Sequence, residues 1–136
     1  MRPLRPAVFF ACAVLAFFAL AAFAMARTAS SPTKVVVDQF TTTGSAETQE
    51  GHWVGHLKSP RKACLRGRTV KLFLRNGNND EIKLADTDRT GRRGHWTLDG
   101  NLFTIDRAQI KVRRKRIGTG DNRRICQPDT FTQFFA

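Results

Sequence analysis

The sequence predicts an all-β protein, an antiparallel β-sandwich of about seven strands that follows an N-terminal signal helix. Three observations carry this prediction. Apolar residues after residue 26 recur with a period of two and hardly anywhere with the helical period of 3.6. Turn signals rich in Gly, Asn and Asp separate the short apolar segments, as is typical of sandwiches. Two cysteines outside the signal segment enclose most of this patterned region.

Residues 63–74 organise the predicted fold. Cys64 and Gly67 precede a strand in which Val70, Leu72 and Leu74 fall on one face, so we expect later strands to pair with it. Cys126 is the other cysteine outside the signal segment. In an exported chain two such cysteines form a disulfide. Closing a loop of about 60 residues stabilises the fold by roughly 4 kcal/mol in the chain-entropy model.

The N-terminal segment has the features of a secretory signal peptide. Arg2 and Arg5 precede an apolar run over residues 7–26, which ends in Ala24-Met25-Ala26. We therefore expect cleavage before Arg27 and a secreted, extracellular protein. The run is also about as long as a bilayer core requires, so an uncleaved membrane anchor is the alternative. Cys12 lies inside the run and is interpreted as a small apolar residue.

Three regions follow from this division: the signal peptide over residues 1–26, a leader with a first strand and a polar loop over 27–50, and the sandwich domain over 51–136. The part after the signal fits one small domain. The precursor has 23 Lys and Arg against 11 Asp and Glu. Two of the basic residues lie in the signal, so the mature chain has 21 against 11, or +10. Such an excess predicts association with polyanions, and the alternative is a charge that only maintains solubility.

Within the mature chain, residues 27–33 are interpreted as a disordered leader. The expected strands are residues 34–40, 53–57, the strand within 63–74, and residues 81–86, 95–98, 102–105 and 108–112. Loops or turns are expected at residues 41–50, 76–80, 88–94, 99–101 and 118–122, and residues 130–136 end the chain. The side chains expected to face inward are Ile82, Leu84, Trp96, Leu98, Ala108, Ile110 and Val112.

An ordered set of short motifs resembles a known family of small secreted bacterial proteins. The motifs are Gly55-His56-Leu57-Lys58-Ser59-Pro60, Cys64, Gly67-Arg68-Thr69-Val70-Lys71-Leu72-Phe73, Ala85-Asp86-Thr87-Asp88, Gly94-His95-Trp96, Ala108-Gln109-Ile110-Lys111-Val112 and Cys126. Over about residues 50–130 they resemble a carboxypeptidase regulatory-like, or prealbumin-like (transthyretin-like), domain. The chain departs from that pattern in having no tyrosine and a longer turn over residues 88–94. The resemblance implies an Ig-like or prealbumin-like sandwich, export, and no catalytic residue.

No catalytic group, metal site or cofactor is expected. His52 and His56 are four residues apart in a strand, about 13 Å, too far for one zinc ion. We expect these histidines and His95 to face solvent. The acidic residues Asp80, Glu81, Asp86 and Asp88 lack the alternation of a calcium loop. Trp53 and Trp96 could stack on sugars, although Trp96 alternates with Leu98 as core residues do.

The most concentrated charge lies near the C-terminal end of the chain. We assign a hypothetical polyanion-binding site to Lys111, Arg113, Arg114, Lys115, Arg116, Arg123 and Arg124. Such charges also protect strand edges from aggregation, which is the alternative. The function expected from the sequence is a secreted non-catalytic module that binds an anionic polysaccharide or a teichoic acid-like polymer of the cell envelope. A small secreted hydrolase, or a cationic toxin or antimicrobial protein, is the alternative, although the chain offers no amphipathic helix for membrane insertion.

Overall fold

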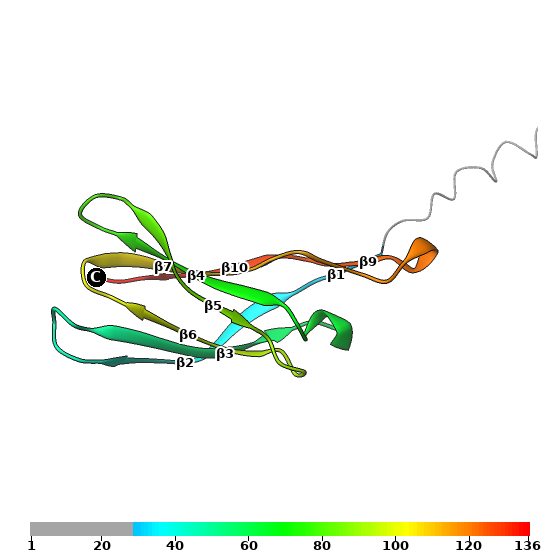
Figure 1. The fold of residues 1–136 in the computed structure, drawn as a ribbon, viewed down its shortest axis with the longest axis horizontal. Helices are drawn as coiled ribbons and strands as arrows, with labels where there is room; N and C mark the ends of the chain where they lie inside the picture. The colour runs from blue at the N-terminus through cyan, green and yellow to red at the C-terminus, as the bar shows by residue number, and fades with distance from the viewer. Residues whose placement is uncertain (1–28) are drawn as a thin grey trace, which may run out of the picture.

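The computed structural model describes residues 29–136, apart from the side chain of Asp121, so the predicted signal peptide and Cys12 lie outside it. The all-β prediction is confirmed (Figure 1). Within the described residues there are ten strands instead of about seven: β1 (Ala29–Ser31), β2 (Lys34–Thr43), β3 (Glu50–Lys58), β4 (Thr69–Asn76), β5 (Ile82–Arg89), β6 (His95–Asn101), β7 (Ile105–Val112), β8 (Lys115–Ile117), β9 (Arg124–Cys126) and β10 (Asp129–Phe134). The short 3-10 helices η2 (Lys62–Cys64) and η3 (Gly120–Asn122) complete the described part. None of its helices is long and apolar enough to cross a membrane.

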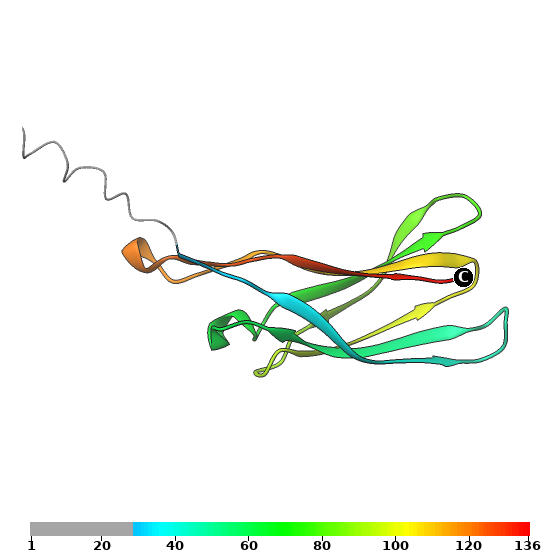
Figure 2. The ribbon, with the colours of Figure 1, turned by 180° about the vertical axis from the view of Figure 1, so that it is seen from behind.

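Two antiparallel sheets face each other as in a β-sandwich (Figures 1 and 2). One has the strand order β10-β7-β4-β5 and the other β2-β3-β6, so the sandwich already includes β2, which precedes residue 51. β4 is central, as expected, and its inward side chains Val70, Leu72 and Leu74 are buried. They pack with the buried Ala108, Ile110 and Val112 of β7, which confirms the predicted inward face of that strand.

The two tryptophans form the opposite wall of the core. Trp53 on β3 and Trp96 on β6 are almost completely buried, together with Leu57 and Leu98. A sugar-stacking role for either indole is therefore wrong, because neither ring face is accessible to a sugar. Gly55 lies opposite Trp96 in the β3–β6 register, and a Cβ there would collide with the indole ring. The close contact between β3 and this ring explains the glycine.

A third sheet, with the order β1-β9-β8, extends beyond the sandwich at one end (Figures 1 and 2). β8 and β9 form an antiparallel hairpin, and β1 pairs with β9 in parallel, with Ser31 opposite Cys126. Residues 29–31 are thus a paired strand, and the prediction of a disordered leader over 27–33 is wrong for them. The Cys64–Cys126 disulfide joins the loop after β3 to β9 across a Cα–Cα distance of 5.4 Å, as predicted.

Two turns differ from the sequence prediction. Residues 99–101, predicted as a tight turn, are the last residues of β6, because Asp99, Gly100 and Asn101 pair with residues 50–52 of β3. The chain reverses instead at residues 102–104, where Thr104 takes a positive φ of 63°. Residues 102–105 are therefore a turn and not a strand, and β7 begins at Ile105.

The inward orientation predicted for Ile82 and Leu84 is wrong, since they are 52% and 51% exposed. The β4–β5 register shifts by one residue between Leu72 and Phe73. Beyond this bulge Leu84 lies opposite Phe73, and Ile82 opposite Arg75. Because side chains alternate along a strand, a shift of one residue moves every later side chain to the other face.

Aspartate side chains connect the two sheets at both open edges of the sandwich. The carboxylates of Asp86 and Asp88 on β5 accept hydrogen bonds from the backbone N–H groups of Asp99 (2.9 Å) and Thr97 (2.8 Å) on the edge strand β6. At the other edge the Asp129 carboxylate accepts one from Val35 N–H on β2 (2.8 Å). These side chains satisfy N–H groups that an exposed strand edge would present to another chain.

Candidate polyanion-binding site

Most of the lysine and arginine side chains lie at the end of the sandwich from which the β8–β9 hairpin extends. Four segments meet there: the β1–β2 link, the loop through η2, the β5–β6 turn and the hairpin. The disulfide joins η2 to the hairpin, while Thr90 Oγ1 donates to the Leu65 carbonyl at 2.6 Å and joins the β5–β6 turn to the η2 loop. We call this region the basic end. Its basic residues are Lys34, Lys58, Arg61, Lys62, Arg66, Arg68, Arg89, Arg92, Arg93, Arg113, Arg114, Lys115, Arg116, Arg123 and Arg124.

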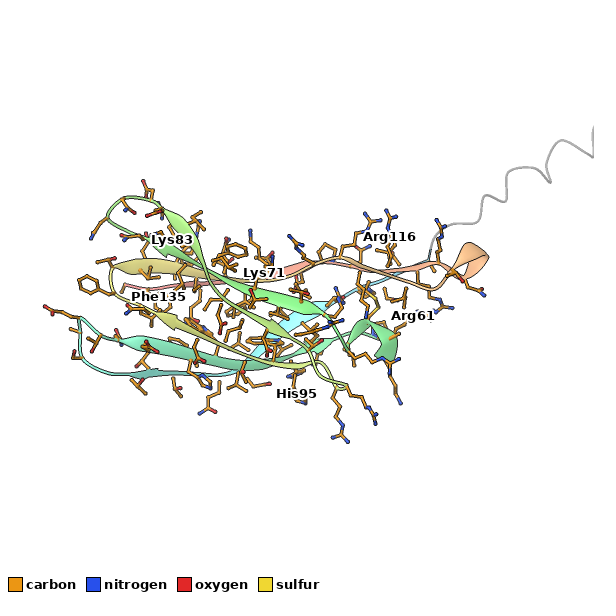
Figure 3. The ribbon with its side chains drawn as sticks, viewed as in Figure 1. Arg61, Lys71, Lys83, His95, Arg116 and Phe135 are labelled. Carbon is orange, nitrogen blue, oxygen red and sulfur yellow. A yellow bond between two sulfur atoms is a disulfide. The ribbon has the colours of Figure 1, made fainter. Side chains whose placement is uncertain are left out.

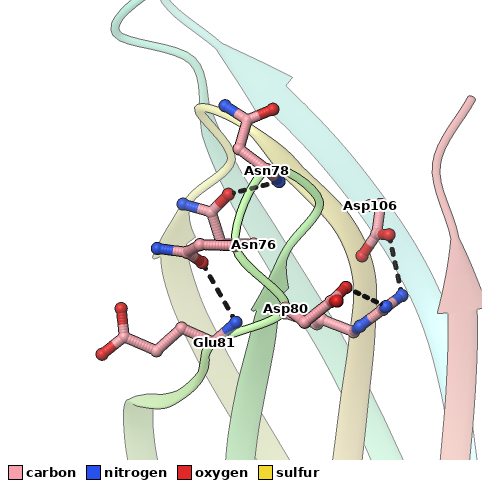
Figure 4. A network of polar contacts seen from close by, with 7 residues as sticks. Asn76, Asn78, Asp80, Glu81 and Asp106 are labelled. Carbon is pink, nitrogen blue, oxygen red and sulfur yellow. Dashed lines mark hydrogen bonds and ion pairs between the residues drawn. The ribbon is translucent and has the colours of Figure 1, made fainter.

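At the opposite end, carboxylates balance the basic side chains. Arg75 pairs with Asp80 and with Asp106 beside the β4–β5 turn (Figure 4), and Lys83 pairs with Glu81. Between the side chains that the structure describes, no ion pair includes a residue of the basic end. Figure 3 shows this separation along the long axis, with Arg61 and Arg116 toward one end and Lys83 toward the other. The molecule therefore has a strong positive potential at one end.

Four of the predicted site residues surround a single hollow on the hairpin. Arg114, Arg116, Arg123 and Arg124 line it together with Ile125, and its volume is about 170 Å³. Arg116 and Ile125 are opposite each other in the β8–β9 register, which places them on the same face. Nη1 of Arg124 is buried and has no hydrogen-bond acceptor within the described part of the chain. We call this hollow the arginine pocket; four arginine residues and no residue with a described carboxylate line it.

Lys115 lies outside the arginine pocket. It alternates with Arg116 along β8, and its Nζ donates to the Arg66 carbonyl at 3.0 Å. The side chains of Lys115 and Arg89 both come within 3.6 Å of the position that a Cβ atom would take at Gly67. Burial, followed by the positive charges of Arg68, Arg66 and Arg89, lowers the pKa of Lys115 below its ordinary value of 10.5. Arg89, which the sequence places far from the hairpin, thus belongs to the same positive region.

The other two predicted residues contribute differently. Arg113 is exposed at the base of the hairpin, between β7 and β8. Lys111 is separate from the basic end, because it lies on the outer face of the four-stranded sheet with its Nζ 5.3 Å from the centroid of the Phe73 ring. That position is a cation–π contact within the sheet face.

Sequence reasoning missed Arg68, the residue that holds the base of the hairpin. Its side chain is 1% exposed. Nη1 donates to the Cys64 carbonyl (2.8 Å) and to Thr33 Oγ1 (3.1 Å). Nη2 donates to the carbonyls of Arg113 (2.7 Å) and Gln127 (3.0 Å), which flank the two hairpin strands. One guanidinium thus fixes both ends of the hairpin, and the disulfide fixes a third point nearby. The available signal was that Arg68 shares the inward alternation of Val70 and Leu72.

The histidines lie on the three-stranded sheet, His52 and His56 on β3 and His95 at the start of β6. His56 contacts the Asp38 carboxylate at 2.7 Å, and His52 contacts that of Asp99. The ring centroids of His56 and His95 are 5.9 Å apart. In the described part of the chain, no three His, Cys, Asp or Glu side chains are grouped so that they could hold a metal ion. The predicted acidic set is likewise divided: Asp80 and Glu81 pair with basic side chains, whereas Asp86 and Asp88 connect the sheets.

Comparisons with protein-family models, with curated proteins and with solved structures found no match. The resemblance to carboxypeptidase regulatory-like domains therefore stays a prediction.

Proposed function

We propose that this protein is a secreted, non-catalytic β-sandwich module that binds an anionic polymer of the cell envelope through its basic end. The observation that carries the proposal is the arginine pocket, which four arginine residues line. Like charges around one small pocket repel one another. A bound phosphate or sulfate group would relieve that repulsion, because guanidinium groups bind such oxyanions with paired hydrogen bonds.

The hairpin is suited to this purpose because its base is held firmly. Arg68 and the disulfide fix the strands that lead into and out of the hairpin. The arginines therefore need less ordering on binding than side chains on a mobile loop, which reduces the entropic cost of association. The surrounding charges of Arg66, Arg89 and Lys115 extend the attractive potential over a longer stretch of polymer.

Retention on immobilised heparin, polyphosphate and teichoic acid tests the binding site. A variant with Arg114→Gln, Arg116→Gln and Arg123→Gln removes three exposed charges from the arginine pocket. The matched control with Lys71→Gln, Lys83→Gln and Lys111→Gln removes the same charge outside the basic end. We expect the pocket variant to elute at much lower salt, with the slope of log affinity against log salt reduced by about one unit per lost contact. The control variant should elute near the wild type.

Two outcomes would reject this site. Equal losses in both variants would mean that only net charge matters. Absence of wild-type retention on all three matrices at about 50 mM salt would reject polyanion binding itself. Circular dichroism should show unchanged folding in both variants, since all the substituted pocket residues are exposed.

Secretion is a separate part of the proposal, supported by the signal-like residues 1–26. N-terminal sequencing of protein from the culture medium should begin at Arg27. Recovery of only the full precursor, in the membrane fraction, would replace secretion with anchoring.

A further inference from the structure

A second hollow at the basic end differs from the arginine pocket in its chemistry. Its volume is about 510 Å³, within the range of small-molecule sites. Its apolar lining residues are Pro32, Leu57, Pro60 and Leu65. Lys34 and Lys58 also line it. Leu57 is buried and belongs to the core, so the floor is part of the rigid sandwich. We call it the apolar hollow.

The positions of Lys34 and Lys58 reduce the stability of the fold, because they bring two positive charges together. Lys34 and Lys58 are directly opposite each other in the β2–β3 register, and both are exposed. Like charges at such positions destabilise a sheet. Neither lysine belongs to an ion pair between described side chains. The nearby Asp129 carboxylate accepts a hydrogen bond from Val35 N–H. An anion between the two ammonium groups would offset their repulsion.

We propose that the apolar hollow binds an amphiphilic anion, with its charged head between Lys34 and Lys58 and its alkyl chain on Pro32, Leu57, Pro60 and Leu65. The apolar lining favours removal of an alkyl chain from water, and the lysines orient the head by charge-assisted hydrogen bonds. A hydrophilic polymer has nothing to place on the apolar lining. The site therefore goes beyond polyanion binding and has a separate class of ligand.

Isothermal titration calorimetry with three probes tests this ligand class. Each probe is used below its critical micelle concentration, and the protein is the one recovered after expression of the full chain. Dodecyl phosphate and dodecanoate share the anionic head and the chain, whereas dodecyl maltoside has the same chain and a neutral head. We expect either anionic probe to bind at least about tenfold more tightly than the maltoside, the effect of charge-assisted hydrogen bonds at the head. The anionic probe that binds more tightly, dodecyl phosphate or dodecanoate, shows whether the site prefers a phosphate or a carboxylate head group. Inorganic phosphate should bind more weakly than dodecyl phosphate.

The double variant Lys34→Gln/Lys58→Gln should reduce the affinity for the anionic probes to that for the maltoside. The matched control Lys71→Gln/Lys83→Gln should leave it unchanged. Leu65→Gln should weaken all three dodecyl probes, because it makes the lining polar. Equal affinity for neutral and anionic probes, an equal loss in the control, or no binding of either anionic probe would overturn the proposal.

The same variants distinguish this site from the polyanion site. The Lys34→Gln/Lys58→Gln variant should lose less retention on heparin than the arginine variant, because both lysines lie outside the arginine pocket. The Arg114→Gln/Arg116→Gln/Arg123→Gln variant should keep its affinity for the anionic amphiphile. If the arginine variant lost the amphiphile as well, binding would not depend on the apolar hollow, and the proposal would be wrong even if polyanion binding held.

Discussion

Nη2 of Arg68 lies 2.7 Å from the carbonyl oxygen of Arg113, so a buried guanidinium immediately before the central strand β4 holds the residue at which the basic hairpin begins. Burial lowers the pKa of Arg68 below its ordinary value, yet an arginine stays protonated in proteins. No described ion pair supplies it with a carboxylate. Its charge is balanced instead by the dipoles of three carbonyl groups and one hydroxyl group. The buried cation Arg68 thus positions the hairpin that carries the exposed arginines.

Replacing Arg68 should destabilise the protein strongly. Arg68→Met removes four hydrogen bonds and leaves buried carbonyl oxygens without donors, so we expect the free energy of unfolding to fall by about 3 kcal/mol or more. Urea denaturation followed by tryptophan fluorescence measures this change. Arg66→Met is the matched control, because Arg66 is exposed and donates no described side-chain hydrogen bond. Similar midpoints for the two variants would show that the Arg68 hydrogen bonds contribute little.

The Cys64–Cys126 disulfide should contribute a comparable amount. The sequence separation is 62 residues, and a loop of this length predicts about 4 kcal/mol from the reduced entropy of the unfolded chain. The double variant Cys64→Ser/Cys126→Ser should show this loss in urea denaturation. Peptide mass mapping without reductant should recover the two cysteines in one linked pair of peptides. Two free thiols at these positions in protein from the medium would contradict the bond.

The sequence predicted the strands from β2 to β7, but it missed β1, β8, β9 and β10 and the places where the alternation changes. β4 and β7 keep a regular alternation, so Val70, Leu72, Ile110 and Val112 were correctly assigned to the core. The one-residue bulge in the β4–β5 pair leaves no local signal, and it reversed the faces assigned to Ile82 and Leu84. Likewise, Asp99-Gly100-Asn101 has turn composition, but pairing with β3 overrides that preference.

The sequence predicted only those parts of the site whose residues are close together along the chain. The run from Arg113 to Arg116 indicated a basic hairpin, and four of the seven predicted residues do line one pocket. Alternation along β8 explains why Lys115 points away from it. The approach of Arg89 to Lys115 depends on the contact between the β5–β6 turn and the η2 loop. A contact between such distant segments cannot be inferred from spacing in one sequence.

The aspartates at the sandwich edge should suppress self-association as well as stabilise the fold. Asp86→Ala/Asp88→Ala leaves the edge N–H groups of Thr97 and Asp99 without their acceptors, at a cost of about 1–2 kcal/mol for each site. An exposed edge also pairs readily with a second chain. Light scattering after size-exclusion chromatography should therefore show concentration-dependent oligomers. Asp86→Asn/Asp88→Asn keeps acceptor oxygens and should stay near the wild type; oligomers of the asparagine variant alone would contradict this explanation.

Lys115 should make stability depend on alkaline pH in a defined direction. Its pKa in the folded protein is lowered, first by burial and then by Arg68, Arg66 and Arg89. The unfolded chain therefore binds more protons at this residue than the folded chain between the lowered pKa and 10.5. In that window the contribution of Lys115 to the free energy of unfolding rises with pH, because deprotonation relieves an unfavourable charge that is partly buried and lies near other positive groups.

Lys115→Met removes this contribution and serves as the reference. The difference in unfolding free energy, wild type minus Lys115→Met, should increase as the pH is raised from neutral toward about 10.5, the ordinary lysine range. Urea denaturation at several pH values measures it. Lys83→Met, at an exposed position at the other end of the molecule, is the control. A difference for Lys115 that falls with rising pH would mean that its ammonium group stabilises the fold, through the hydrogen bond to the Arg66 carbonyl, more than burial and neighbouring charges destabilise it.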